Sequence, residues 1–136
     1  MFDPWRLVAE LAGWTILRRP IKTRGLTSWR DRTIILDPAL SRVEERAVLT
    51  HELVHARRGP TLERLLHREE AAVRREAAVL LIDIVHLGDA AAWSRHALVI
   101  AVELDVDEDT ILARAETLTP AERAAIDARL ETIHLP

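Results

Sequence analysis

The segment His51-Glu52-Leu53-Val54-His55 has the residue types and the spacing of a metal site. Two histidines four residues apart lie on one face of an α-helix, on adjacent turns, so both imidazoles can bind one zinc ion. Glu52 lies beside that face, where its carboxylate can accept the proton of a water molecule activated by the metal. Six histidines and thirteen glutamates in 136 residues would yield roughly 0.02 such matches by chance, which argues against an ordinary solvated helix face.

A catalytic zinc site needs a third protein ligand and one open coordination position. The metzincin class of metallopeptidases is excluded, because Arg58 and Thr61 stand where that class requires glycine and histidine. A glutamate from the following helical segment is the other standard ligand. That segment offers Glu69, Glu70 and Glu76.

Glu70 is the strongest of these candidates for the third ligand. It continues the apolar stripe of residues 73–84, so we predict that its side chain faces inward. Burying a carboxylate is costly unless a cation or a metal pairs with it, which favours a ligand role for Glu70. Glu69 and Glu76 share a more polar face of the same segment. A surface glutamate paired with an arginine is the alternative for Glu70, and His67 is then the spare ligand.

The N-terminal residues predict one short helix followed by a small sheet. Asp3 and Pro4 form an N-cap and a first helical position, and the helix runs to about Leu11. Bulky and β-branched residues predict strands at 14–17, 26–29 and 33–36. Residues 30–32 suit a hairpin turn between the last two strands, so we expect an antiparallel or mixed sheet.

From Ser41 onward the sequence pattern is helical. Ser41 and Glu44 form a capping box at the start of the helix that carries the two histidines, and Gly59-Pro60 ends it. Further helices are predicted at residues 61–85, 90–103, 107–116 and 120–133. The fold class is therefore α+β, with a small N-terminal sheet packed on the histidine helix and the glutamate helix. We expect one domain over 1–136, with the metal motif in a core at 1–88 and a C-terminal helical extension at 89–136.

The composition is that of an ordinary soluble protein, with 49% hydrophobic and 30% charged residues. The formal net charge of -3 gives no general attraction to nucleic acid or to anionic membranes. The absence of cysteine excludes disulfides and thiolate ligands. No apolar run reaches about 18 residues and the N-terminus lacks the features of a signal peptide, so we expect a cytoplasmic monomer or weak dimer without membrane contact.

Residues 97–118 have the apolar spacing of a helix-turn-helix. Acidic residues crowd the turn, namely Glu103, Asp105, Asp107, Glu108 and Asp109. A phosphate backbone would be repelled by this cluster of negative charge. We therefore predict core packing or a docking surface at this segment, and no direct contact with nucleic acid.

Three segments together resemble the ImmA/IrrE family of metallopeptidases, namely residues 45–55, 70–73 and 77–81. Many metallopeptidases share the HExxH pattern, whereas the downstream glutamate helix with its Ala-Ala-Val-Leu-Leu stretch narrows the resemblance, which covers residues 5–118. The resemblance implies a compact gluzincin-like fold with Glu52 as the general base. The zinc ligands that it implies are His51, His55 and Glu70. It also implies a protein substrate, a helix-turn-helix repressor whose cleavage derepresses phage, mobile-element or stress genes.

Two positions depart from the family pattern. Val54 stands where the family often has glycine, and Arg74 stands where the third-ligand helix often has aspartate or asparagine. An acid that orients a ligand histidine is then missing or comes from another residue, such as Asp83. Arg74 and the small size leave a second hypothesis open. In that hypothesis the chain is a non-proteolytic, metal-binding regulatory partner, a pseudoprotease or antirepressor that binds such a repressor without cutting it.

The sheet beside the metal helix suggests how a substrate binds, because zinc peptidases commonly add the substrate as a strand to that sheet. The strand at 26–29 or the strand at 33–36 is expected to have this role. The residues expected to bind substrate are Trp29, Arg30 and Arg32. Residues 18–32 contain six cations and a single acidic residue, so this stretch can steer an acidic substrate segment toward the cleft.

Peptide hydrolysis also needs a hydrogen-bond donor for the oxyanion that develops on the scissile carbonyl. Tyrosine is absent, so the candidate donors are His86 and His96, with Arg75 as a further one. The alternative for each of them is a structural or solvent-facing position.

Overall fold

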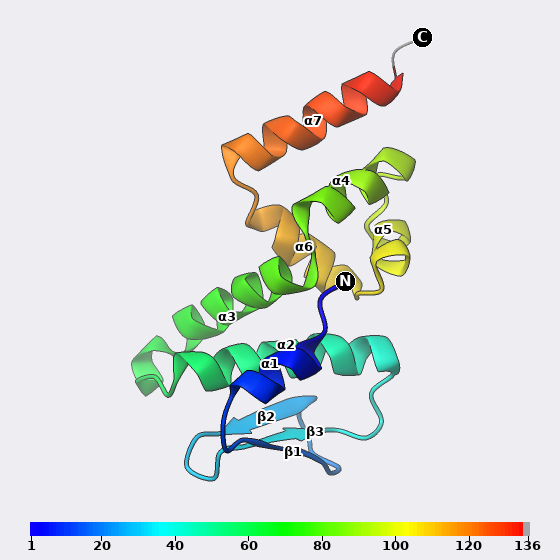
Figure 1. The fold of residues 1–136 in the computed structure, drawn as a ribbon. Helices are drawn as coiled ribbons and strands as arrows, with labels where there is room; N and C mark the ends of the chain where they lie inside the picture. Colours follow the sequence, from blue (N-terminus) through cyan, green and yellow to red (C-terminus); the bar gives the residue numbers. More distant parts are fainter. Residues whose placement is uncertain (135–136) are drawn as a thin grey trace.

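A three-stranded sheet lies at one end of the molecule, and helices cover one of its faces and extend away from it (Figure 1). The computed structural model describes residues 1–134. The elements in chain order are α1 (Pro4–Glu10), β1 (Thr15–Arg18), β2 (Gly25–Ser28), β3 (Thr33–Leu36), α2 (Arg42–Arg58), a 3-10 turn (Glu63–Leu65), α3 (Leu66–Leu81), α4 (Ile84–Trp93), α5 (Ala97–Leu104), α6 (Glu108–Glu116) and α7 (Pro120–His134). The predicted α+β class is confirmed.

The sheet is mixed, with the strand order β1-β3-β2. β2 pairs antiparallel with β3 through the hairpin predicted at residues 30–32, whereas β1 pairs parallel with β3, so that Thr15 lies opposite Thr33. β3 therefore has a neighbour on each side. The alternative in which residues 33–36 receive a substrate strand is wrong, and β2 is the edge strand that remains for this role.

Helix α2, which carries the two histidines, begins and ends as predicted. The Ser41 hydroxyl oxygen accepts a hydrogen bond from the Glu44 amide, and the Glu44 carboxylate accepts one from the Ser41 amide. The helix ends at Gly59, whose positive φ of 88° suits glycine. Leu49 and Leu53 are fully buried in the cluster that also contains the β3 side chains, so the sheet packs mainly on α2. Helix α3 packs on α2 from the side away from the sheet (Figure 1).

The helix predicted at residues 61–85 is shorter than expected. It begins with the 3-10 turn, continues as α3 and ends at Leu81, where Ile82 adopts an extended conformation. The Asp83 carboxylate then accepts a hydrogen bond from the Val85 amide and caps the next helix. The apolar stripe continues through this break, because Ile82 and Ile84 both pack into the core after the chain turns. The spacing of the apolar residues alone therefore does not reveal where α3 ends.

The helix predicted at residues 90–103 is also wrong, because two helices occupy this region. α4 ends at Trp93, and α5 begins at Ala97. The boundary expected at residue 88 between core and extension falls inside α4, where Gly88 lies close to the Arg129 side chain of α7. The helices predicted at 107–116 and 120–133 correspond to α6 and α7.

The C-terminal helices share a core with the helices that carry the metal motif. One buried cluster combines residues of α2, the end of α3, α4, α5 and α6, namely Ala47, Leu81, Ile82, Leu87, Ala90, Ile100, Ala101, Val106 and Ile111. Arg114 of α6 is 4% exposed and donates a hydrogen bond to the Ile82 carbonyl, which satisfies the backbone where α3 ends. α6 is thereby held beside α3, and this position matters for the cleft described below.

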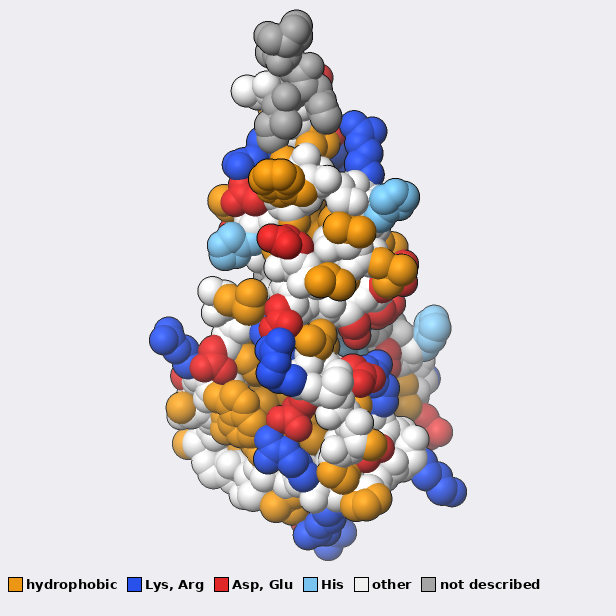
Figure 2. Space-filling view, turned by 90° about the vertical axis from the view of Figure 1, so that its right-hand side faces the viewer, with side chains coloured by type: hydrophobic (Ala, Val, Ile, Leu, Met, Phe, Trp, Pro, Cys, Tyr) orange, Lys and Arg blue, Asp and Glu red, His pale blue; other side chains and the backbone are white. Residues whose placement is uncertain are grey.

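The molecule is broad at the sheet and narrows toward α7 (Figure 2). On the face shown there, acidic and basic side chains lie close to one another, without a continuous surface of one sign. Ion pairs join separate elements, as between Arg18 of β1 and Glu45 of α2 at 2.7 Å. Within residues 1–134, no helix combines the length and the apolar character needed to cross a bilayer.

Candidate metal centre

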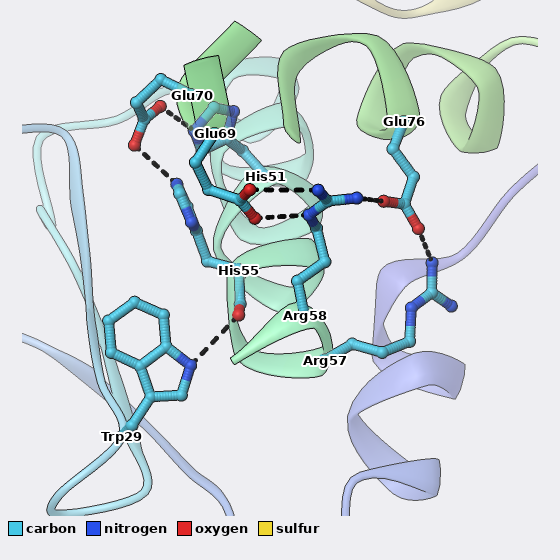
Figure 3. Close-up of polar contacts among 8 residues, drawn as sticks. All are labelled: Trp29, His51, His55, Arg57, Arg58, Glu69, Glu70 and Glu76. Carbon is cyan, nitrogen blue, oxygen red and sulfur yellow. Dashed lines mark hydrogen bonds and ion pairs between the residues drawn. The ribbon is translucent and has the colours of Figure 1, made fainter. Parts of the chain in front are cut away.

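Three side chains predicted as ligands converge between α2 and α3 (Figure 3). The Nε2 atom of His51 lies 3.0 Å from one carboxylate oxygen of Glu70, and the Nε2 atom of His55 lies 2.7 Å from the other. The two imidazole centroids are 5.0 Å apart. The ligand atoms of all three residues lie within 4.8 Å of one another. The four-residue spacing on α2 thus produces the shared face that the sequence predicts.

This donor set fits a divalent metal ion. Ligands at about 2.0–2.1 Å from a tetrahedral zinc lie roughly 3.3 Å from one another. The two distances between Glu70 and the histidines are slightly shorter than this, so small side-chain rotations would open the group around an ion. Two imidazole nitrogens and one carboxylate also leave room for a fourth ligand from solvent. The group could therefore hold a metal ion.

The reason given for choosing Glu70 is wrong, although the structure brings this residue to the histidines. We predicted an inward-facing side chain, but the Glu70 side chain is 55% exposed. The two other candidates are less exposed, with Glu69 at 18% and Glu76 at 33%. The exposure of the side chain therefore does not identify the candidate ligand. The hydrogen-bond partners of the three glutamates do identify it.

Two arginines at the end of α2 hold the other candidate glutamates away from the histidines (Figure 3). Arg58 donates to both carboxylate oxygens of Glu69, at 2.5 and 3.1 Å, and to Glu76 at 3.2 Å. Arg57 donates to the other oxygen of Glu76 at 2.6 Å. The hydrogen bonds from Arg58 hold the pKa of the Glu69 carboxyl below its ordinary value. These pairs also join α3 to α2 through residues before and after Glu70 in the sequence.

Glu52, the expected general base, is 8% exposed and is held by the edge strand β2. The Thr27 hydroxyl oxygen lies 2.5 Å from Oε2 of Glu52 and 3.1 Å from the Glu52 carbonyl oxygen. Gly25 permits the close approach of the strand, since a Cβ atom there would lie 2.6 Å from Val48 Cγ1 and 2.9 Å from Glu52 Cγ. β2 thus fixes the orientation of a buried carboxylate next to His51.

Trp29, predicted to bind substrate, supports the second histidine. Its indole Nε1 donates a hydrogen bond to the His55 carbonyl at 3.1 Å (Figure 3). Its ring meets the His55 imidazole edge-on at 6.2 Å between centroids. Arg30 and Arg32 lie exposed in the turn between β2 and β3, where Arg32 has a positive φ of 49°. This turn follows β2 directly, so it begins two residues after Thr27.

A cleft of about 400 Å³ opens beside the candidate metal ligands. His51, Glu52 and Glu70 line it on one side. The remaining lining residues come from the start of β2 and from α2, α3 and the region of α6: Arg24, Gly25, Ala47, Val48, Arg74, Ala77, Ala78, Leu81, Asp107, Asp109, Thr110 and Ala113. The candidate base and two of the three candidate ligands therefore face a space that can receive a substrate segment.

The histidines proposed as oxyanion donors are not brought to this cleft. His86 is exposed on α4 and lines a separate cavity with Phe2 and Trp93. His96 is exposed at the start of α5. Asp83, suggested as the acid that orients a ligand histidine, caps α4 instead. The positions of these three residues do not support the roles suggested for them.

Sequence reasoning missed that Thr27 would hold the Glu52 carboxylate and that Asp109 would line the cleft. Arg74, noted only as a departure from the family pattern, donates to Asp109 at 3.0 and 3.1 Å and to Glu116 at 2.8 Å. Its guanidinium therefore binds α6, and these hydrogen bonds lower the pKa of the Asp109 carboxyl. No local sequence signal links Arg74 to partners more than thirty residues away.

No protein-family model matches this chain, and no curated protein or solved structure is significantly similar to it. The resemblance to the ImmA/IrrE family therefore depends on the motif residues alone. The geometry of the candidate metal centre is the independent observation on which a functional proposal can be based.

Proposed function

We propose that this chain is a zinc-dependent endopeptidase of the ImmA/IrrE type, with a gluzincin-like arrangement of its metal site. The proposal is carried by one observation: ligand atoms of His51, His55 and Glu70 converge, and His51 and Glu70 line a cleft together with the buried Glu52. Ordinary surface histidines and glutamates do not require a buried acid next to them or an edge strand that orients it. In a zinc peptidase, a carboxylate held beside the metal serves as the general base.

Glu52 acts as the general base in this proposal. A zinc ion held by the three ligands would polarise a peptide carbonyl and acidify water. The Glu52 carboxylate accepts a proton from the attacking water and returns it to the leaving amine. Thr27 holds Oε2 of this carboxylate, which leaves Oε1 for the proton. Because Thr27 lies on β2, the strand that receives the substrate also orients the base.

The edge position of β2 supports binding of an extended peptide. Its inner edge pairs with β3. On the side toward α2, Gly25 lies close to Val48 and Glu52, Thr27 donates a hydrogen bond to Glu52, and Trp29, directly after the strand, donates one to the His55 carbonyl. A peptide added to the outer edge would run past the metal centre with its backbone paired, which is a common mode of peptide recognition. The cleft takes a short segment of chain, so the substrate must present an exposed loop or linker.

The regulatory substrate is proposed from the resemblance of the motif segments. We propose that a helix-turn-helix repressor encoded next to this chain is cleaved in the cytoplasm, which derepresses phage, mobile-element or stress genes. Binding of that repressor without the appearance of fragments, with zinc present, would instead indicate the non-proteolytic regulatory partner. Arg74 favours this second candidate, because it stands where the family often has an aspartate or asparagine and it binds α6 instead.

The test compares the wild-type chain with Glu52→Gln, both loaded with zinc, on the neighbouring repressor. Removal of a general base lowers the cleavage rate by about 10²–10⁴-fold, so fragments should form with the wild type and be almost absent with the variant. Glu103→Gln is the matched control, since it makes the same chemical change at an exposed position of α5. Cleavage by Glu52→Gln at the wild-type rate would exclude the mechanism.

A further inference from the structure

The cleft beside the metal centre has an apolar floor and a charged rim. The floor residues are at most 8% exposed and come from α2, α3 and α6: Ala47, Ala77, Ala78, Leu81 and Ala113. The rim residues are charged and more exposed: Arg24, Glu70, Arg74 and Asp109. A substrate side chain that enters the cleft therefore passes the charged rim residues and then contacts the apolar side chains of the floor.

Alanine is the reason that this space exists. Four of the five floor residues are alanines, so the facing helices do not fill the volume between them as leucines would. The floor also adjoins the ligands: Ala47 lies one turn before His51 on the same face of α2. On α3, Ala77 lies two turns after Glu70. A side chain next to a peptide bond at the metal centre can therefore reach this floor.

Helix α6 completes the cleft from the side opposite α2. Thr110 and Ala113 line it, and both are buried. Arg74 binds Asp109 and Glu116, which lie on either side of these two residues along α6, and so fixes the distance between α3 and α6. The width of the cleft is thus set by the C-terminal helices, which gives them a part in selecting what enters it.

We infer that this floor is a specificity pocket for one large aliphatic or aromatic side chain adjacent to the scissile bond. The inference rests on the proposed function and adds the substrate class to it. Removing such a side chain from water favours a leucine or phenylalanine over an alanine by roughly 10–100-fold in affinity. A carboxylate side chain is disfavoured, because the floor would remove it from water without a partner.

Binding of small zinc-chelating ligands tests the pocket independently of proteolysis. The probes are peptide-like hydroxamates that differ in one side chain: isobutyl, benzyl, methyl or carboxymethyl. Titration calorimetry on the zinc-loaded chain should give dissociation constants about 10–100-fold lower for isobutyl and benzyl than for methyl, with carboxymethyl the weakest. Equal dissociation constants across the series, or no binding of any hydroxamate to a chain that retains zinc, would overturn the inference.

Two variants change the cleft in opposite directions. Ala113→Leu fills the floor and should abolish the preference for isobutyl and benzyl, whereas Val48→Ala, at another lining residue, widens the cleft beside the floor and should strengthen benzyl binding. Val48→Ala removes atoms without a clash, so it keeps the test valid if Ala113→Leu does not fold. Ala124→Leu, at an exposed position of α7, is the matched control and should bind as the wild type does. An unchanged preference in Val48→Ala and in folded Ala113→Leu would contradict the pocket.

The outcomes separate this inference from the proposed function. Selective hydroxamate binding without cleavage of the repressor would support the pocket and contradict the peptidase. Cleavage that depends on Glu52, together with equal hydroxamate affinities, would support the peptidase and contradict the pocket.

Discussion

The Thr27 hydroxyl donates a hydrogen bond to the Glu52 carboxylate, with 2.5 Å between the two oxygens. This contact joins the edge strand β2 to helix α2 at the residue that we propose as the general base. A buried carboxylate has few orientations open to it, and a hydrogen bond to one oxygen selects among them. The base and the substrate-binding edge are therefore coupled through one side chain.

Thr27→Val removes this hydrogen bond and keeps the shape of the side chain. Hydrogen bonds to charged groups contribute about 1.5–3 kcal/mol, so the turnover number should fall by roughly 10-fold or more while zinc content stays unchanged. Thr27→Ser retains the hydroxyl and should restore most of the rate. Steady-state kinetics with metal analysis checks this, and a wild-type rate in Thr27→Val would show that the contact does not orient the base.

Gly25→Ala should destabilise the protein, because the new Cβ would lie 2.6 Å from Val48 Cγ1 and 2.9 Å from Glu52 Cγ. Overpacking of this kind costs about 1–3 kcal/mol of unfolding free energy. Gly88→Ala is the matched control: the nearest atom there, at 3.6 Å, belongs to the Arg129 side chain, and alanine favours the helix by about 0.5–1 kcal/mol. Urea unfolding measures both, and equal effects would contradict the close approach of β2.

Replacement of any one of the three candidate ligands should remove zinc from the purified protein. His51→Ala, His55→Ala and Glu70→Gln are each expected to weaken zinc affinity by more than about 100-fold, since even supporting residues of metal sites cost 10–100-fold. His67→Ala removes an exposed histidine one turn before Glu70 and should retain the metal. Competition with a coloured chelator gives the affinities, and wild-type affinity in Glu70→Gln would exclude this residue as a ligand.

The pairing of Arg42 with Asp105 predicts a pH dependence of stability. The hydrogen bonds from Arg42, at 2.6 and 2.7 Å, hold the pKa of the Asp105 carboxyl below its ordinary value. A lowered pKa in the folded state stabilises the protein above the unfolded value of about 3.9, and this contribution is lost as the pH falls through the folded value.

Asp105→Asn provides the comparison, because asparagine also tolerates the left-handed backbone conformation at this position. The variant should be less stable than the wild type at neutral pH; the difference should shrink as the pH falls below about 4 and disappear once the pH is below the lowered pKa of Asp105. Chemical unfolding at a series of pH values measures the difference. A difference that persists at low pH would show that the ion pair is not its source.

Local sequence signals predicted much of the architecture. The capping box of Ser41 and Glu44, the hairpin turn at 30–32 and the start of α7 at Pro120 depend on neighbouring residues, and the structure contains all three. The helical spacing of His51 and His55 likewise required no information beyond the motif. Their metal binding stays a prediction.

Contacts between distant segments account for the features that the sequence did not predict. The choice among three glutamates depends on Arg57 and Arg58, which lie on another helix, and the exposure of Glu70 follows from how α3 packs on α2. Arg74 meets Asp109 across 35 residues of chain. The sequence also did not predict the parallel pairing of β1 with β3, because the composition of a strand does not specify which strand it pairs with.

The central claim is that His51, His55 and Glu70 bind one metal ion together. The most direct test is a crystal of the zinc-loaded chain measured on both sides of the zinc absorption edge. The account predicts one strong anomalous peak within about 2.0–2.2 Å of both Nε2 atoms and a Glu70 oxygen, with Glu52 beside it. A peak at other residues, or none between α2 and α3 in protein that had been saturated with zinc, would contradict it.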